Sequence, residues 1–192
     1  MRQSAKVGLI VLFLMGVAGC KTTGGLTVYV SPTADFTVIK KVAILPFENM
    51  TQDRFAGEKV QKLVTIDLLS LGVFDILETG QVARVLREQG IENPTGMAPA
   101  QIKKLGEALG AQAFVFGAVV DYGESRSGTI PSPDVTIQLR LVEARSGGTL
   151  WSVSGTRSGA KLSTQLFGVG GETPTQAAER LIRTEVDTIL AK

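Results

Sequence analysis

The sequence predicts an α/β fold, a sandwich in which helices pack on a mixed β-sheet. Two continuous apolar runs, residues 42–47 and 114–120, have the pattern of strands covered on both faces. Helical periodicity lies between them, and alternating apolar and polar residues follow from 135 to 141. The predicted order is β-α-β-α-α-β, then an antiparallel hairpin and a C-terminal helix.

The helices are predicted from spacing and from their end signals. Residues 55–71 form the first, with Gly72 at its C-terminus, and a short strand follows at 74–77. Thr79 is expected to cap a second helix that ends at Gly90. A third helix begins at Pro99 and ends before Gly110, and Thr173-Pro174 opens the last one. The apolar positions expected on the inner face of that last helix are Ala178, Leu181, Ile182, Val186, Ile189 and Leu190.

A hairpin is predicted around the turn at 146–149. Residues 135, 137, 139 and 141 are apolar and alternate with polar ones, while Trp151 and Val153 continue the pattern beyond the turn. The acidic residues Asp121, Glu124 and Asp134 are expected near the loop that joins the two strands before the turn. As carboxylates they are candidates for a calcium or acid–base site, but their spacing is not that of an EF-hand, and solvated charges at strand ends are commoner.

The N-terminus has the features of a bacterial lipoprotein signal peptide. Arg2 and Lys6 precede an uncharged, mostly apolar run at 7–17, which is shorter than the roughly 20 residues that span a bilayer. The run ends in Ala18-Gly19-Cys20, which resembles a lipobox. We expect residues 1–19 to be removed and Cys20 to carry the lipid; an ordinary cleaved signal or an uncleaved anchor is the alternative.

Composition beyond Cys20 indicates one globular domain. Arg2 and Lys6 are the only charged residues in the first 19, so the remainder has 18 basic and 18 acidic residues. This balance gives no reason to expect a nucleic-acid partner. Residues 20–36 are expected to be the lipidated cysteine and a short tether containing an edge strand at 26–30. Residues 37–192 are expected to form the domain.

The sequence argues against an enzyme. It has no histidine and one cysteine, so we expect no catalytic residues, no metal site and no cofactor. Ser158-Gly159-Ala160-Lys161 has the S-x-x-K spelling of penicillin-recognising enzymes but follows a predicted strand instead of opening a helix. The glycines at 168–171 lack the Gly-Lys-Ser/Thr ending of a phosphate loop.

Several stretches together resemble the curli-secretion lipoproteins (CsgG) and the lipoprotein activators of penicillin-binding proteins (LpoB). They are Lys41-Val42-Ala43-Ile44-Leu45-Pro46-Phe47-Glu48-Asn49, Phe74-Asp75-Ile76-Leu77-Glu78, Leu86-Arg87-Glu88-Gln89, Gly110-Ala111-Gln112-Ala113-Phe114-Val115-Phe116-Gly117 and residues 135–149. The resemblance covers most of the chain after Cys20. It implies either a periplasmic accessory protein or a subunit of an oligomeric secretion complex.

The accessory interpretation is favoured, because residues 123–133 and 162–172 are too short for the membrane-spanning hairpins of pore-forming relatives. Lys21 after the lipidated cysteine favours the periplasmic face of the outer membrane. The 16 residues from Cys20 to Asp35 reach at most roughly 50 Å. The expected partners are the membrane, an envelope protein and, as the alternative, further copies in a homo-oligomer. The candidate contact residues are Leu166 and Phe167, which could instead fold onto the core, and the polar face of the hairpin at Thr136, Gln138, Arg140, Ser152 and Ser154.

Overall fold

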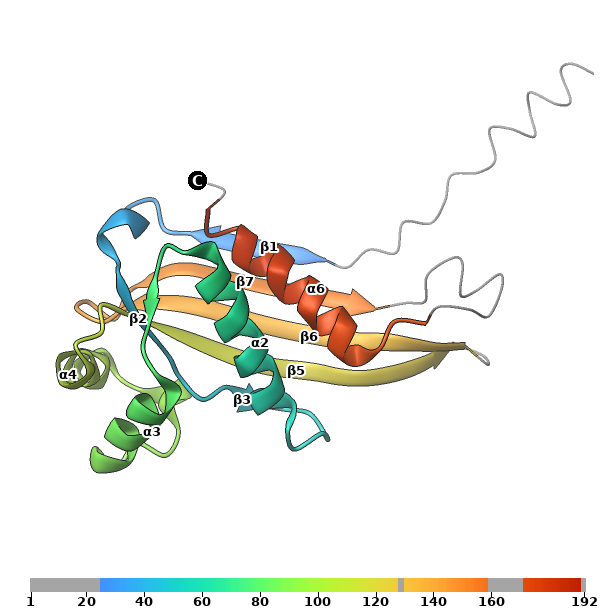
Figure 1. Ribbon diagram of the computed structural model, residues 1–192, viewed down its shortest axis with the longest axis horizontal. Coiled ribbons are helices and arrows are strands. Elements are labelled where there is room, and N and C mark those ends of the chain that lie inside the picture. Colours follow the sequence, from blue (N-terminus) through green and yellow to red (C-terminus); the bar gives the residue numbers. More distant parts are fainter. Residues whose placement is uncertain (1–24, 128–129, 159–170, 191–192) are drawn as a thin grey trace, which may run out of the picture.

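The computed structural model describes residues 25–127, 130–158 and 171–190, with residues 126, 127, 130 and 131 described in backbone only. These residues form a mixed seven-stranded sheet with helices on both faces (Figure 1). The α/β class, the element order and the closing hairpin and helix are confirmed.

The strands are β1 (Leu26–Val30), β2 (Lys41–Ile44), β3 (Glu48–Asn49), β4 (Asp75–Ile76), β5 (Ala113–Ser127), β6 (Ile130–Glu143) and β7 (Thr149–Ser158). The helices are α2 (Ala56–Leu71), α3 (Thr79–Glu88), α4 (Pro99–Leu109) and α6 (Pro174–Asp187), with short 3-10 turns η1 (Phe36–Val38) and η2 (Pro94–Gly96). The sheet order is β1-β7-β6-β5-β2-β4, and β3 pairs with β5. The strands β5, β6, β7 and β1 are antiparallel neighbours, whereas β2, β3 and β4 are joined by parallel pairing.

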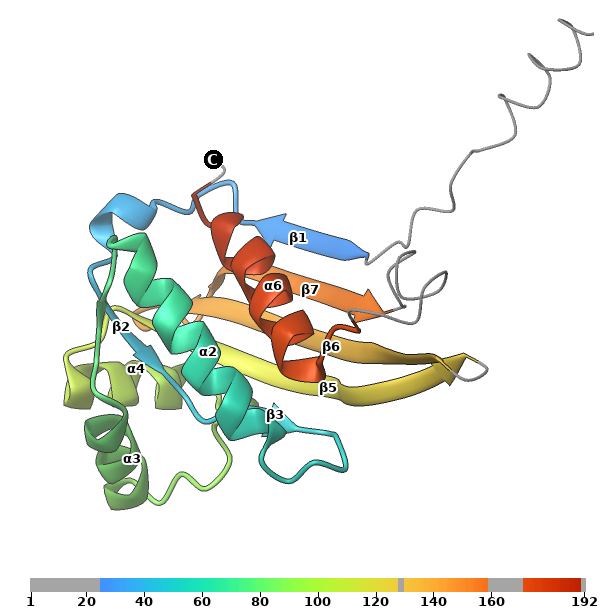
Figure 2. The same ribbon diagram turned by 45° about the vertical axis from the view of Figure 1, so that its right-hand side comes forward.

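One face of the sheet is covered by α2 and α6, which lie side by side across it (Figure 2). Both helices present an apolar stripe because their buried residues recur every three or four positions, as Val60, Val64 and Leu68 do in α2. These side chains pack on strand residues of the same cluster, including Ile137 and Leu139. The larger part of the core lies here.

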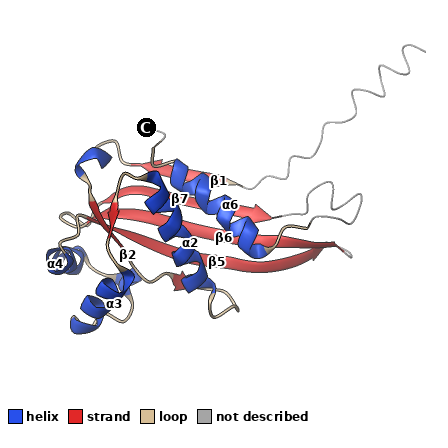
Figure 3. Cartoon of the chain, in the orientation of Figure 1, coloured by secondary structure: helices blue, strands red, loops and turns tan. Residues whose placement is uncertain are grey.

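The opposite face is covered at one end only, by α3 and α4 (Figure 3). The fully buried Phe114 of β5 and Leu105 of α4 belong to this second cluster, together with Val142 near the end of β6. Among the described helices, none belongs to a cluster with this face of β1 and β7. Within the described residues, a broad part of this face therefore has no helix over it.

The β5–β6 hairpin is longer than the sequence predicts. Asp121 and Glu124 lie in β5 and Asp134 lies in β6, so the expected loop between the strands is wrong over most of its length. Pro131 and Pro133 make this part of the sequence look unlike a strand. Both precede Asp134, which is the first residue of β6 that pairs with β7. A strand with a neighbour on one side needs only alternate N–H groups, so proline is tolerated there.

Smaller differences concern helix ends. Glu78, not Thr79, caps α3, because its carboxylate accepts a hydrogen bond from the Gln81 N–H at 2.7 Å. At the C-terminus Leu190 lies after the end of α6 and is 50% exposed, so it does not belong to the inner stripe.

Part of the expected tether lies in the sheet. Strand β1 pairs with β7 from Leu26 to Val30, as the edge strand that the sequence indicates. Hydrogen bonds continue this pairing at both ends, from the Thr156 N–H to the Gly25 carbonyl and from the Ser31 N–H to the Leu150 carbonyl. Only residues 21–24 then separate Cys20 from the paired chain.

Candidate docking surface

The polar residues predicted on the outer face of the hairpin do lie together on the open face of the sheet. Cross-strand pairing places Arg140 opposite Ser152, and Gln138 opposite Ser154. Thr136 lies opposite Thr156, and their hydroxyl oxygens are 3.1 Å apart in a hydrogen bond. Because side chains alternate along a strand, all of these point away from α2 and α6. We call Thr136, Gln138, Arg140, Ser152, Ser154 and Thr156 the open face.

A groove of about 270 Å³ crosses this surface toward β3 and η2. Its lining includes Gln138, Arg140 and Ser152 of the open face and, from β5, Phe116. The Arg140 guanidinium carbon lies 4.9 Å from the centre of the Phe116 ring. This cation–π contact holds a positive charge over an apolar floor, an arrangement that recognises carboxylate or aromatic groups of a partner.

The open face continues to the free edge of the sheet. Tyr29 of β1 lies opposite Ser152 and is 51% exposed. Within the described residues β1 has β7 as its only strand neighbour, so its outer N–H and C=O groups can pair with another chain. Leu26 and Val28 add exposed apolar surface at this edge.

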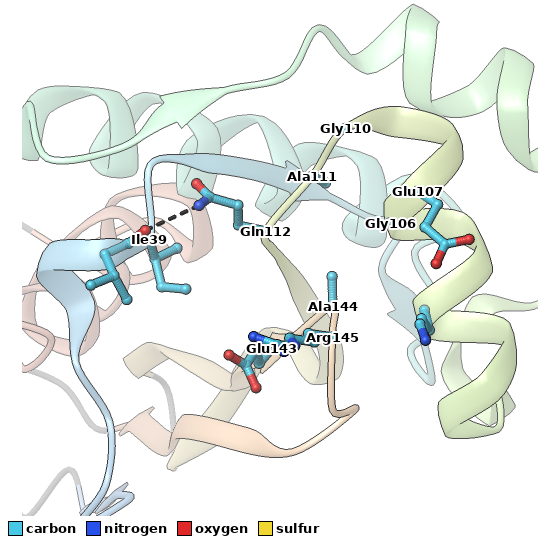
Figure 4. Close-up of a pocket in the computed structure, with 11 residues that line it drawn as sticks. Ile39, Gly106, Glu107, Gly110, Ala111, Gln112, Glu143, Ala144 and Arg145 are labelled. Carbon is cyan, nitrogen blue, oxygen red and sulfur yellow. Dashed lines mark hydrogen bonds between the residues drawn. The ribbon is translucent and has the colours of Figure 1, made fainter.

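A second hollow, of about 410 Å³, lies at the end of the sheet where β2 begins (Figure 4). Gln112 closes one side of it: its side-chain oxygen accepts hydrogen bonds from the N–H groups of Lys40 and Lys41, at 2.7 and 3.0 Å. Its amide nitrogen donates to the Val38 carbonyl at 3.1 Å. The lining also carries Arg145 and Glu107, so both signs of charge are present.

The lining of the second hollow also includes Lys103 and Glu143. The side chain of Gln112 is used to join η1 and β2 to the start of β5, which is a structural role. Across the described ranges, no group of three or more histidine, cysteine, aspartate or glutamate residues is arranged to hold a metal ion. The chemistry that these surfaces offer is hydrogen bonding, ion pairing and apolar contact.

The described carboxyl group with the largest pKa shift is that of Glu185, which lines neither hollow. Glu185 of α6 is fully buried and points at Gly155 of β7, where an added Cβ would lie 2.6 Å from its carboxyl oxygen. Burial raises the pKa of the Glu185 carboxyl to about 9, and the nearby Gly155 backbone opposes the shift only in part. The group is therefore a neutral acid inside the core at physiological pH.

Glu185 and the groove were not predicted from the sequence. Glu185 follows Leu181 by four residues and Ile182 by three, so helical spacing alone places it on the buried face of α6. The groove depends on η2 and β3 coming near β6, which no local pattern encodes. Cys20, Leu166 and Phe167 lie outside the described residues.

Several known proteins are similar to this chain over most of its length. A putative lipoprotein of Neisseria meningitidis serogroup B, NMB1124/NMB1162, is 24% identical over 146 residues, which are 73% of this chain and 67% of the relative. The PelC dodecamer of Paraburkholderia phytofirmans has a similar subunit fold, with a TM-score of 0.60, 20% identity, and coverage of 88% of this chain and 99% of PelC. Lipoprotein GNA1162 of Neisseria meningitidis matches with a TM-score of 0.58 and 20% identity, over 80% of this chain and 99% of GNA1162.

The family profile described as "Putative lipoprotein GNA1162-like" matches residues 36–190. That range begins just after β1 and includes every helix of the described structure. The expectation that the chain belongs to a lipoprotein family with this fold is thus confirmed. The assignment to CsgG stays a prediction. The chain belongs to the GNA1162-like lipoprotein family.

Proposed function

We propose that this protein is an outer-membrane lipoprotein, anchored through Cys20 at the periplasmic face, that acts without catalysis by binding another envelope protein. Family membership supports the lipid anchor, and Lys21 supports sorting to the outer membrane. No helix within the described ranges is both long and apolar enough to cross a membrane.

The observation that carries the binding role is the open face with its groove. A sheet face in water needs polar side chains, and the hydroxyls here meet that need. The groove has a further feature that is not needed to keep the sheet soluble. The Arg140 guanidinium lies over the Phe116 ring, beside the exposed side chain of Met50. Arginine and aromatic side chains are enriched where protein partners bind.

Photo-crosslinking in living cells tests this surface. A crosslinking amino acid at Gln138 or Ser154 should give a defined adduct, whereas one at Lys62 or Glu179, which are exposed on α2 and α6, should not. The adduct's mass separates another envelope protein from a second copy of this chain. Adducts that form equally from both faces, or from the helix face alone, would contradict the proposed surface.

Charge reversal gives a matched comparison. Arg140→Glu should weaken capture of the crosslinked partner at least tenfold, because it removes the cation over Phe116 and adds a carboxylate to the groove. Arg87→Glu makes the same change at an exposed position of α3 and should leave capture unaltered. Titration of purified partner against each variant measures the difference, and equal affinities for the two would sink the role of Arg140.

The anchor is tested separately. Cells fed a clickable analogue of palmitate should label the native protein, and Cys20→Ala should lose the label and leave the membrane fraction, since no other cysteine is present. A Cys20→Ala protein that stays in the membrane would contradict lipid anchoring. Retained label in that variant would contradict attachment at Cys20.

The second candidate function is that of a homo-oligomeric ring, which would accompany a secretion or assembly complex. PelC of Paraburkholderia phytofirmans is a dodecamer, and within the described residues β1 offers a free strand edge to a second copy. Light scattering of detergent-extracted protein separates the two candidates. A monomer counts against the ring, and a stable high-order assembly counts against a simple docking protein.

A further inference from the structure

Backbone hydrogen bonds between β1 and β7 come from alternate residues of β1. The Thr156 N–H donates to the Gly25 carbonyl, and the Ser31 N–H donates to the Leu150 carbonyl. Both bonds belong to one antiparallel register, in which every second residue from Gly25 to Ser31 bonds to β7. The residues between them direct their N–H and C=O groups to the outer side of the strand. These residues are Leu26, Val28 and Val30.

The outer side of β1 lacks the features that usually prevent a strand edge from pairing. The strand has no charged residue and no proline, and its pairing with β7 has no bulge. Within the described residues β7 is its only strand neighbour, and β1 lies at the margin of the sheet (Figure 2). On the sheet, helix α6 packs mainly over β6 and β7. The outward backbone groups of β1 are thus available to a further strand.

The side chains along this edge are apolar or carry a hydroxyl group. Leu26 and Val28 lie on the side of the sheet that α6 covers, because Val28 pairs with the buried Val153 of β7. They remain 38% and 40% exposed. Tyr29 points to the other side of the sheet and is about half exposed. An added strand would cover apolar surface on both sides, and a charged strand would lose hydration without gaining an ion pair, so the edge favours an uncharged strand.

We propose that β1 pairs with β1 of a second copy of this chain, antiparallel and in a register centred on Val28. Val28 then lies opposite the partner's Val28, and Leu26 lies opposite the partner's Val30. Each such pair exchanges two hydrogen bonds, so the three outward residues of each strand form about six bonds in all. Every outward N–H and C=O group of both strands is used, and the two sheets become one continuous sheet.

The order of side chains in β1 favours a second copy over an unrelated strand. Residues of matching character stand on each side of Val28. The nearer two carry hydroxyl groups and the further two are aliphatic: Thr27 with Tyr29, and Leu26 with Val30. In the two-fold pair each side chain therefore meets one of its own kind. A register shifted by two residues would leave one outward residue of each strand unpaired, so the register centred on Val28 is the one that uses the whole strand.

A two-fold contact closes on itself, so this pairing yields a dimer. The dimer goes beyond the proposed docking function, and it differs from a ring, which needs a different contact between subunits. The groove at Arg140 is lined mainly by β3, β5 and β6, so a dimer can still bind a partner there. Strands of five residues form a small interface. Confinement of both copies to one membrane by the proposed lipid anchor raises their effective concentration and favours the pairing.

Disulfide cross-linking of the full-length protein in isolated membranes tests the register. Val28→Cys should give a disulfide-linked dimer on mild oxidation, because about 5.5 Å separates the Cα atoms of a hydrogen-bonded pair. Leu26→Cys is the matched control. The two residues are similarly exposed, but in the proposed register the two copies of Leu26 are offset by four residues, roughly 13 Å along the strand. Val28→Cys should therefore give roughly fivefold more dimer. The parent chain, whose only cysteine is Cys20, measures the background.

Co-expression of two variants extends this test. Leu26→Cys and Val30→Cys together should cross-link about as well as Val28→Cys alone, because Leu26 and Val30 lie opposite each other in the proposed pair. Equal yields from Leu26→Cys alone and Val28→Cys alone, or a higher yield from Leu26→Cys, would overturn the register. An absence of dimer from every variant would overturn the pairing itself, and so would an adduct with a different protein in place of the dimer.

Backbone and charge substitutions at Val28 provide the second test, made in the co-expressed Leu26→Cys and Val30→Cys chains. Val28→Pro removes an outward N–H but no hydrogen bond to β7, and Val28→Lys places like charges opposite each other. Each should lower the dimer yield roughly fivefold, whereas Val28→Thr, which keeps the N–H and the branched shape, should not. Urea unfolding should give similar midpoints for all three. Dimer yields unchanged by both Val28→Pro and Val28→Lys would show that β1 is not the contact.

Discussion

At pH 8 the Glu185→Gln variant should be more stable to unfolding than the native chain, by roughly 3–5 kcal/mol. Burial raises the pKa of the Glu185 carboxyl to about 9 from an ordinary value of 4.5. Below pH 4.5 the carboxyl is protonated in both states and does not alter stability. Between these values the unfolded chain releases the proton and the folded one keeps it, so stability falls as pH rises.

Urea unfolding at pH 5 and pH 8 measures this effect, with Trp151, the only tryptophan, as the fluorescent probe. The native chain should lose roughly 3–4 kcal/mol between the two pH values beyond what Glu185→Gln loses. Glu179→Gln, an exposed position on the same helix, should follow the native pH dependence. If the native chain and Glu185→Gln had parallel pH profiles, Glu185 would have to be ionised or solvated in the folded protein.

Removing the Phe114 ring should lower the free energy of unfolding by about as much as Glu185→Gln raises it at pH 8. Phe114 is fully buried between β5 and the α3–α4 layer, and truncation of a buried phenylalanine to alanine costs about 3–5 kcal/mol. The loss combines the lost burial of the ring with the cavity that it leaves. Phe114→Ala should therefore unfold at markedly lower urea concentration, again followed by Trp151 fluorescence.

Leu69→Ala is the comparison for this experiment. Leu69 is 53% exposed on α2, so its truncation should change the unfolding free energy by less than about 0.5 kcal/mol. Similar small effects from both variants would mean that α3 and α4 are not packed on the sheet as described. A large effect from Leu69→Ala would instead point to an interface covering the outer side of α2.

Local periodicity predicted the elements whose packing is simple. The stripe of α2 and the alternation in β6 repeat at the period of their structure, and glycines at positive φ end α2 and α4 at Gly72 and Gly110. The outer hairpin could not be predicted in this way. Of the side chains described between Asp121 and Asp134, only that of Tyr122 belongs to the main core, so no hydrophobic alternation marks this part of the strands, although backbone pairing continues through it.

The candidate surface also combines features that local periodicity predicts with features that it does not. Thr136, Gln138 and Arg140 were predicted to share an outer face, because alternation fixes the face of a strand residue. Their groove arises from segments distant in sequence, with Glu48 and Thr95 on its border. Close approach of Phe47 to β5 belongs to this class as well: an added Cβ at Gly117 would lie 2.6 Å from the Phe47 ring. Such contacts between distant segments leave no local pattern.

The position of β1 next to the proposed anchor has a mechanical consequence. Any pull from Cys20 enters at Gly25 and acts along β1, whose hydrogen bonds to β7 run across the direction of the force. Such a load shears the pairs together instead of opening them one after another from an end. The five-residue strand thereby spreads the tension, and traction between the envelope layers reaches the sheet before it reaches any helix.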